Sequence, residues 1–362
     1  MMLGAATITR SLSRFHFNYH SPPLLTTTWL RDFSTESFLD KESVMSEVLK
    51  EFRATIENAP ASRAGVYYAY IDRMCKFGNL SAATQMLQIL NDKNIVISRN
   101  LYNLILVEAI LKNDIDLSCQ VLKKLLLSGE SPSATSCIKF AQAFRKVIHL
   151  LELLKFFKEI VSETSCSSIS SFINKMVFAF AKSGQKDRAL MIFEHLKRQN
   201  DRCFDLTTYN IVLYILGGTG RVDEMLDVFA SLKEAGFVPD TISYNTLING
   251  LRKVGRFDMC FEYFKEMKEN GNEPDLLTYT SLIDVFGRAG NIKESLKFFR
   301  EMKLKGIFPS IQIYRSLIHN LNKIEKIELA TELLEEMNSS STCLAGPSDF
   351  KTFKTKRRLR KS

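Results

Sequence analysis

The sequence predicts an all-α fold, a solenoid of about eight stacked helix-turn-helix units. Segments of 35 residues resemble one another along the chain, and each carries two apolar stripes with the spacing of an α-helix. Only 8 Pro occur in 362 residues, which leaves long helices unbroken. A two-helix unit cannot bury its own apolar face, so neighbouring units must stack, and a continuous core beside a concave groove follows.

The 35-residue repeat is clearest in three consecutive segments, which end at Asp240, Asp275 and Ser310. In these units and the next, apolar residues at i, i+3, i+4 and i+7 predict a first helix, and a second stripe predicts a second helix. The first stripes begin at Tyr209, Tyr244, Tyr279 and Tyr314, and the second stripes at Met225, Cys260, Ser295 and Ala330.

Glycine and proline mark the ends of the predicted helices. Glycine tolerates the left-handed backbone of a tight turn, and it recurs between the two stripes at Gly220, Gly255 and Gly290. Proline stops a helix from continuing and holds the preceding residue extended, and it closes the units at Pro239, Pro274 and Pro309.

The same interval divides most of the chain into units. An amphipathic stretch from Lys41 to Asn58 predicts an N-terminal cap within residues 35–63, and residues 346–362 predict a basic, disordered tail. The third and the last unit depart most from the pattern, and the last is expected to cap the stack. The units are 64–98, 99–133, 134–169, 170–205, 206–240, 241–275, 276–310 and 311–345.

The first 34 residues have the composition of an organelle transit peptide, with Arg10, Arg14 and Arg31, many Ser and Thr, and no acidic residue before Asp32. The run that ends at Ser34 resembles the cleavage context of mitochondrial presequences. We therefore expect a mitochondrial protein, with the chloroplast as the alternative. An ordinary disordered N-terminus is the other interpretation of this segment.

Composition narrows the function classes. A net charge of +9 and a pI near 9.1 favour a polyanionic partner, because each Lys or Arg near a phosphate releases counterions, although part of the excess lies in the terminal segments. The seven cysteines are scattered singly, which predicts reduced thiols and no zinc site. No run of 18 apolar residues occurs, so no membrane span is expected. Neither a cofactor nor a metal is predicted.

The pattern xTYNxLIxGL…G…A…xFxxMxxxGxxPD of residues 206–310 resembles the pentatricopeptide repeat family, specifically its P class of plain 35-residue repeats. The resemblance covers roughly residues 64–337. It implies a right-handed solenoid that binds single-stranded RNA in plant organelles and reads one base per repeat. We expect a monomer with RNA as its partner, and with organellar RNA-processing or ribosomal proteins as further partners.

In the family, the fifth and the last residue of each repeat read the base. The resemblance therefore implies uracil at three units, cytosine at one, and a purine where Thr280 stands, which gives n-C-n-U-U-U-purine-n from the 5′ end. Three other units carry pairs to which no base is assigned. The RNA-binding pairs are Asn103 with Ser133, Asn174 with Asp205, Asn210 with Asp240, Asn245 with Asp275, and Thr280 with Ser310.

Other interpretations of these residues stay open. Aspartate before a helix is a favoured N-cap whatever the partner, whereas asparagine within the first helical turn is a mediocre helix former and is harder to explain structurally. An enzyme is not expected, because the sequence carries neither the deaminase-type zinc signature nor an intact phosphate loop, and no catalytic residue is predicted. A protein-interaction scaffold, for example of the mitochondrial ribosome, is the alternative function.

Overall fold

The computed structural model describes six stretches of the 362-residue chain, which are residues 40–58, 64–146, 150–164, 166–199, 203–339 and 344–345. The predicted transit peptide of residues 1–34 and the predicted basic tail of residues 346–362 lie outside the described residues. Of the predicted N-terminal cap, residues 35–63, the structure describes residues 40–58.

Within the described residues the chain forms seventeen α-helices and no strand. A short 3-10 helix, Phe144–Lys146, follows the sixth, and the eighth begins ahead of the expected unit boundary at residue 170. The α-helices are α1 Asp40–Asn58, α2 Ala64–Lys76, α3 Leu80–Asp92, α4 Arg99–Leu111, α5 Ile115–Leu127, α6 Ala134–Ala143, α7 Leu150–Glu163, α8 Cys166–Lys182, α9 Lys186–Lys197, α10 Leu206–Thr219, α11 Val222–Glu234, α12 Thr241–Lys253, α13 Phe257–Glu269, α14 Leu276–Arg288, α15 Ile292–Leu304, α16 Ile311–Lys323 and α17 Ile327–Ser339.

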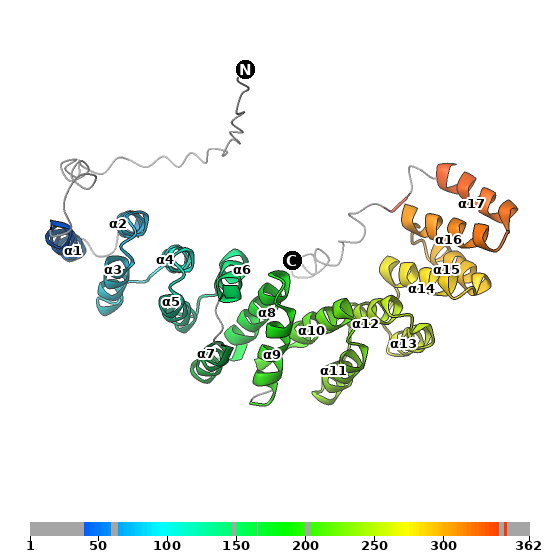
Figure 1. The fold of residues 1–362 in the computed structure, drawn as a ribbon, viewed down its shortest axis with the longest axis horizontal. Coiled ribbons are helices and arrows are strands. Elements are labelled where there is room, and N and C mark those ends of the chain that lie inside the picture. Colours follow the sequence, from blue (N-terminus) through cyan, green and yellow to red (C-terminus); the bar gives the residue numbers. More distant parts are fainter. Residues whose placement is uncertain are drawn as a thin grey trace, which may run out of the picture.

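From α2 onward the helices form pairs that stack side by side into an arc (Figure 1). The even-numbered helices α2 to α16 each contact the next even-numbered helix, and we call them the inner row. The odd-numbered helices α3 to α17 form the outer row, where neighbours contact each other less. A stack curves toward its more closely packed side, so the inner row lines the concave face. The predicted fold class, an all-α solenoid, is confirmed.

The core runs without interruption from one unit to the next. The tyrosine that opens each first stripe is among the largest fully buried side chains, as at Tyr244 and Tyr314. Phe229 of α11 packs edge-on against Tyr244 of α12 with ring centroids 5.5 Å apart, and Phe299 of α15 packs against Tyr314 of α16 at 5.3 Å. Such contacts join the outer helix of one unit to the inner helix of the next.

A glutamate accepts the hydroxyl of a buried tyrosine and forms an ion pair with a lysine across each of three unit boundaries. Glu266 of α13 accepts Lys233 Nζ of α11 at 2.6 Å and Tyr244 Oη of α12 at 2.7 Å. We call these groups the Lys–Glu–Tyr sets, and the other two are Lys268, Glu301 and Tyr279, and Lys303, Glu336 and Tyr314. Each set ties two consecutive outer helices to one inner helix.

The turn glycines adopt the left-handed backbone that the sequence predicts. The φ angle is 75° at Gly220, 81° at Gly255 and 78° at Gly290, each at the turn between an inner and an outer helix. In the last unit the same turn falls at Glu325, whose φ is 59°. A non-glycine residue is strained in this region, so the last unit turns at some cost in stability.

Small residues let neighbouring helices of the inner row approach each other. A Cβ added to Gly250 of α12 would lie 3.1 Å from the Cα of Gly217 of α10 and 2.6 Å from Met225 Sδ. A Cβ at Gly287 of α14 would meet Asn320 of α16. These approaches set the spacing of the inner row, and with it the spacing of the side chains on its concave face.

Candidate nucleic-acid interface

Aspartate ends three consecutive units, and each aspartate caps the inner helix of the following unit. Its carboxylate accepts the backbone N–H three residues on, and the hydroxyl oxygen of that residue accepts the N–H of the aspartate, which is a reciprocal capping box. The pairs are Asp205 with Thr208, Asp240 with Ser243, and Asp275 with Thr278. The N-cap interpretation of these aspartates is therefore confirmed.

Three of the predicted asparagines contact the aspartate that ends their own unit. Asn245 Nδ2 donates to Asp275 Oδ1 at 2.9 Å, and Asn210 Nδ2 donates to Asp240 Oδ1 at 3.3 Å. Asn174 Nδ2 lies 3.0 Å from both carboxylate oxygens of its partner, Asp205. The partners are 30 or 31 residues apart in sequence, so stacking of the units creates the contacts. The aspartates thus serve as helix caps and as partners of the asparagines at once.

A hydroxyl from the following inner helix completes two of these pairs. Thr278 Oγ1 donates to Asn245 Oδ1 at 2.6 Å, and Thr208 Oγ1 donates to Asn174 Oδ1 at the same distance. With its oxygen held by the threonine and one amide hydrogen held by the carboxylate, the asparagine has a single orientation. A side chain fixed in this way can discriminate hydrogen-bonding patterns.

Asn210 lacks this third partner. The corresponding residue is Ser243, whose hydroxyl donates to Asp240 Oδ1 at 2.9 Å. Asn210 Oδ1 is buried and has no hydrogen-bond partner among the described residues. A buried acceptor without a donor costs about 1–3 kcal/mol, so Asn210 is held by fewer hydrogen bonds than Asn174 and Asn245 and at some cost in stability.

The other two predicted pairs are arranged differently. Asn103 Oδ1 accepts the hydroxyl of Ser136 at 3.0 Å and the backbone N–H of Ser133 at 3.5 Å. Thr280 donates its hydroxyl to a backbone carbonyl of its own helix at 2.6 Å, and Ser310 is buried and caps α16. The first pair is brought together through the serine backbone, whereas Thr280 and Ser310 share no hydrogen bond among the described residues.

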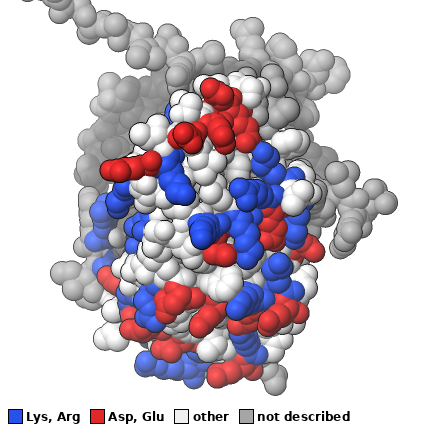
Figure 2. Space-filling model, turned by 90° about the vertical axis from the view of Figure 1, so that its right-hand side faces the viewer, with Lys and Arg blue, Asp and Glu red and all other residues white. Residues whose placement is uncertain are grey.

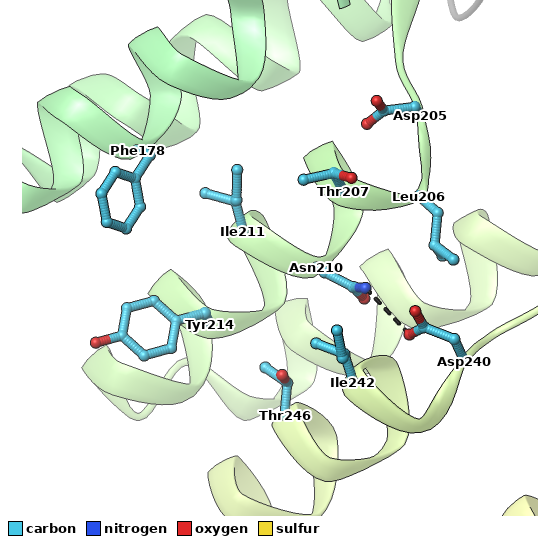
Figure 3. Close-up of a pocket in the computed structure, with 10 residues that line it drawn as sticks. All are labelled: Phe178, Asp205, Leu206, Thr207, Asn210, Ile211, Tyr214, Asp240, Ile242 and Thr246. Atoms are coloured by element: carbon cyan, nitrogen blue, oxygen red, sulfur yellow. Dashed lines mark hydrogen bonds between the residues drawn. The ribbon is translucent and has the colours of Figure 1, made fainter. Parts of the chain in front are cut away.

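A cleft of about 570 Å³ opens on the inner row between α8, α10 and α12. Asp205, Asn210 and Asp240 contribute to its polar lining, and Figure 3 shows the Asn210–Asp240 hydrogen bond on one side of it. The rings of Phe178 and Tyr214 lie on the opposite side in the same view. The cleft can therefore offer hydrogen bonds from one side and aromatic surface from the other.

Phe178 and Tyr214 were missed as candidate site residues from the sequence. They hold the ninth position of two consecutive units, 170–205 and 206–240, and the ninth position lies one helical turn beyond the fifth on the same helix face. Ile242 also lines the cleft, and it is the second residue of unit 241–275, two positions after Asp240. Comparing side chains at equal offsets outside the fifth and last positions would have revealed the aromatic pair.

The described part of the chain is close to neutral. Its Lys and Arg outnumber Asp and Glu by one, whereas the excess over the whole sequence is nine. Figure 2, which views the end of the solenoid at the right of Figure 1, shows the two signs interspersed. Most of the excess of positive charge, which favoured a polyanionic partner, belongs to residues 346–362. Any attraction of nucleic acid to the solenoid therefore depends on local rows of charge.

One such row lies on the inner helices. Exposed basic residues recur at the thirteenth position of five units, in the last turn of each inner helix, about 12 Å along the helix axis from the fifth position. A cation there also interacts favourably with the helix dipole, whatever the partner. The row consists of Lys76, Lys182, Lys253, Arg288 and Lys323.

Four of the described cysteines are poorly suited to nucleophilic chemistry. Burial raises the pKa of Cys75, Cys119, Cys137 and Cys260 to about 12, so the nucleophilic thiolate is scarce at neutral pH. Among the described residues no group of three His, Cys, Asp or Glu side chains could hold a metal ion. None of the described helices combines the length and the apolar content that crossing a bilayer requires.

The fold and the repeated Asn–Asp pairs define a helical-hairpin repeat protein. The PPR repeat family matches residues 205–253, 239–288 and 278–323, and the PPR repeat matches residues 174–200 and 313–341. A pentatricopeptide repeat-containing protein of Arabidopsis thaliana is 42% identical over 127 residues, which are 34% of this chain and 34% of that protein. The matched segments, which lie between residues 174 and 341, are therefore pentatricopeptide repeats. The chain's match spans about a third of the length of this curated relative.

Two solved structures of pentatricopeptide repeat proteins match parts of this chain. The pentatricopeptide repeat protein PPR10 of maize, in complex with an 18-nt psaJ RNA element, gives a TM-score of 0.48 at 21% identity over 88% of this chain and 46% of that one. The PPR domain of the Arabidopsis thaliana protein-only RNase P 1, in complex with tRNA, gives a TM-score of 0.43 at 16% identity. This match covers 52% of this chain and 98% of that one.

Proposed function

We propose that this protein binds single-stranded RNA sequence-selectively in a plant organelle and has no catalytic centre of its own. The observation that carries the proposal is the row of Asn–Asp pairs in three consecutive units, each held by a hydrogen bond between positions that only the stacked fold brings together. A structural role explains the aspartates as caps. It does not explain why an asparagine stands beside each aspartate, or why Asn210 and Asp240 line the cleft together.

The chemistry of the pair fits the Watson–Crick edge of uracil. Asn210 Nδ2 uses one hydrogen on Asp240 Oδ1 and keeps a second one to donate, and Asp240 Oδ2 stands outside this bond as an acceptor. Uracil presents a carbonyl acceptor beside an N–H donor on its Watson–Crick edge, so a donor next to an acceptor can bind it. Units 170–205, 206–240 and 241–275 would then read three consecutive uracils.

The proposed target is n-C-n-U-U-U-purine-n, with one base per repeat and the 5′ end at the N-terminal units. The finer assignments, the P class and a monomeric state follow the sequence expectation, as does the mitochondrion, with the chloroplast as the alternative. A stable solenoid on a transcript can block exonucleases or keep a splice, cleavage or ribosome-entry site unpaired. The proposed effect on the transcript is therefore passive.

Fluorescence polarisation with labelled RNA tests the proposal. Asn245→Ala should weaken binding to the uracil-containing target by about 1–3 kcal/mol, roughly 5- to 150-fold in Kd, because one base loses its hydrogen bonds. The same change should leave binding to poly-adenine, already weak, unaltered. Asn322→Ala, an exposed asparagine at the end of α16, is the matched control and should change neither value. Equal affinity of the wild-type chain for the target and for poly-adenine would refute the proposal.

A protein-interaction scaffold is the second candidate, and the near-neutral charge of the described residues favours it. RNA crosslinking and co-purifying proteins can be measured on the same tagged chain in isolated organelles. A variant carrying Asn210→Ala, Asn245→Ala and Asp275→Ala should lose RNA crosslinks and keep its protein partners. Loss of the partners with the crosslinks retained would favour the scaffold.

A further inference from the structure

Two aromatic rings face the cleft although the fold does not need them there. Phe178 of α8 is 44% exposed and Tyr214 of α10 is 62% exposed, and both line the cleft with Asn210 and Asp240. The tyrosines that build the core behave differently, since Tyr209, which lies in the same helix as Tyr214, is 1% exposed. A large ring left in water at this place forgoes the burial that normally explains an aromatic residue.

Phenylalanine or tyrosine holds the ninth position in two of the eight units, and the last unit carries His319 there. At the same position the two units that follow the aromatic pair carry Asn249 and Asp284, and both are engaged by Arg252, which donates to Asp284 Oδ2 at 2.5 Å and to Asn249 Oδ1 at 2.9 Å. In units 241–275 and 276–310 the side chain at the ninth position is therefore polar and hydrogen-bonded to Arg252. Over units 170–205 and 206–240 it is aromatic and open.

A cation accompanies the first ring. Lys182 lies one helical turn beyond Phe178, with its Nζ 5.9 Å from the ring centroid, and it is exposed. An aromatic face, a nearby ammonium group and the polar side formed by Asn210 and Asp240 correspond to the three parts of a nucleotide, which has a planar base, a hydrogen-bonding base edge and an anionic phosphate. An RNA strand presents these three parts together in every nucleotide.

We propose that Phe178 and Tyr214 stack on unpaired bases of the bound RNA and anchor it at units 170–205 and 206–240. This inference rests on the proposed RNA-binding function and deepens it. Every base has an aromatic face, so stacking adds affinity without choosing among bases. The two rings supply strength at the units where the Asn–Asp pairs supply selectivity, and the RNA is held most firmly in the middle of the solenoid.

The test uses the full chain, with fluorescence polarisation on two single strands, the predicted target and the same strand with its central uracils replaced by adenines. Phe178→Ala with Tyr214→Ala should weaken binding to both strands by the same factor, roughly 5- to 150-fold per stacked base. The ratio of the two affinities should stay as in the wild type. Phe308→Ala, which removes a ring that is 60% exposed and lies outside the cleft lining, should change neither.

A direct contact readout comes from tryptophan fluorescence. Trp29 is the only Trp of the chain, so Trp29→Phe with Tyr214→Trp leaves a single indole in the cleft. Single-stranded RNA should quench that indole, and a strand with abasic sites at the uracils should not. The inference is supported if RNA quenches the indole fluorescence and if the alanine variant loses affinity for both strands by the same factor.

Three results would overturn it. If the Phe178→Ala, Tyr214→Ala variant binds RNA as tightly as the wild type while Asn245→Ala still weakens binding, the stacking is refuted. The proposed RNA-binding function is then unaffected. If the variant loses affinity for the uracil-containing strand alone, the rings contribute to base selectivity, which contradicts stacking. Failure of the wild-type chain to bind either strand refutes both the stacking and the proposed function.

Discussion

Asp275 illustrates how much one side chain does at the residue scale. A single carboxylate oxygen accepts the backbone N–H of Thr278 and the amide N–H of Asn245, each at 2.9 Å. Capping stabilises the following inner helix, and the amide contact orients the proposed reading residue. The two functions can be separated by substitution, because serine caps a helix nearly as well as aspartate does but is too short to hold the asparagine.

Both Asp275→Ser and Asp275→Ala lose the contact with Asn245, but only the serine keeps the cap, so the free energy of unfolding should be about 1 kcal/mol lower in the alanine variant than in the serine variant. Both variants should weaken binding of the uracil-containing strand. Urea denaturation followed by circular dichroism gives the stabilities, and polarisation gives the affinities. A serine variant that binds RNA like the wild type would show that the carboxylate has no role beyond capping.

At the scale of the element, the inner helices are positioned by small residues at their crossings. Gly250 faces Gly217 so closely that a Cβ would meet backbone atoms, and backbone cannot rotate away as a side chain can. The crossing places α10 beside α12, which carry Asn210 and Asn245 in consecutive units. The geometry of the interface thus depends on residues that take no part in it.

Gly250→Val should destabilise the chain by about 1–3 kcal/mol, because α10 and α12 would have to separate. Gly218→Ala on α10 is the control, since its Cβ would meet only the end of the Lys186 side chain, at 3.9 Å. That substitution should stabilise the chain by up to about 1 kcal/mol through helix propensity. The midpoints of thermal unfolding distinguish the two. Equal stability of Gly250→Val and the wild type would mean that the crossing tolerates a wider spacing.

At the scale of the whole molecule, the Lys–Glu–Tyr sets link consecutive units and depend on protonation. Burial raises the pKa of Tyr244 and of Tyr279, and their hydrogen bonds to Glu266 and Glu301 raise it further. Each phenol therefore keeps its proton in the folded chain at a pH where the unfolded chain has lost it. The stability that depends on these phenols is complete below about pH 10, the ordinary tyrosine pKa, and decreases as the pH rises above that value.

The solenoid should accordingly lose stability between about pH 9 and pH 11, and Tyr244→Phe with Tyr279→Phe should lose less over the same interval. The buried cysteines, whose pKa is also raised, contribute to the loss in both chains, so the difference between the two isolates the phenols. Urea midpoints at both pH values provide the measurement, and Tyr214→Phe, at an exposed ring, serves as the control. Identical pH dependence in all three chains would contradict this account.

The sequence by itself determined the period, the helices and their caps, because these depend on local spacing. Apolar residues at helical intervals, Gly255 in a turn and Asp240 before a helix act within a few residues of where they stand. The asparagines could be singled out in the same way, since they recur at a constant offset.

Only the tertiary structure decided which side chains meet. Asn245 and Asp275 are brought together by stacking, and Asn210 differs from Asn245 because Ser243 turns its hydroxyl to the aspartate where Thr278 reaches the amide. The aromatic side of the cleft also depends on neighbouring units approaching each other. Contacts between residues 30 or more positions apart depend on the curvature and spacing of the stack, which local patterns do not encode.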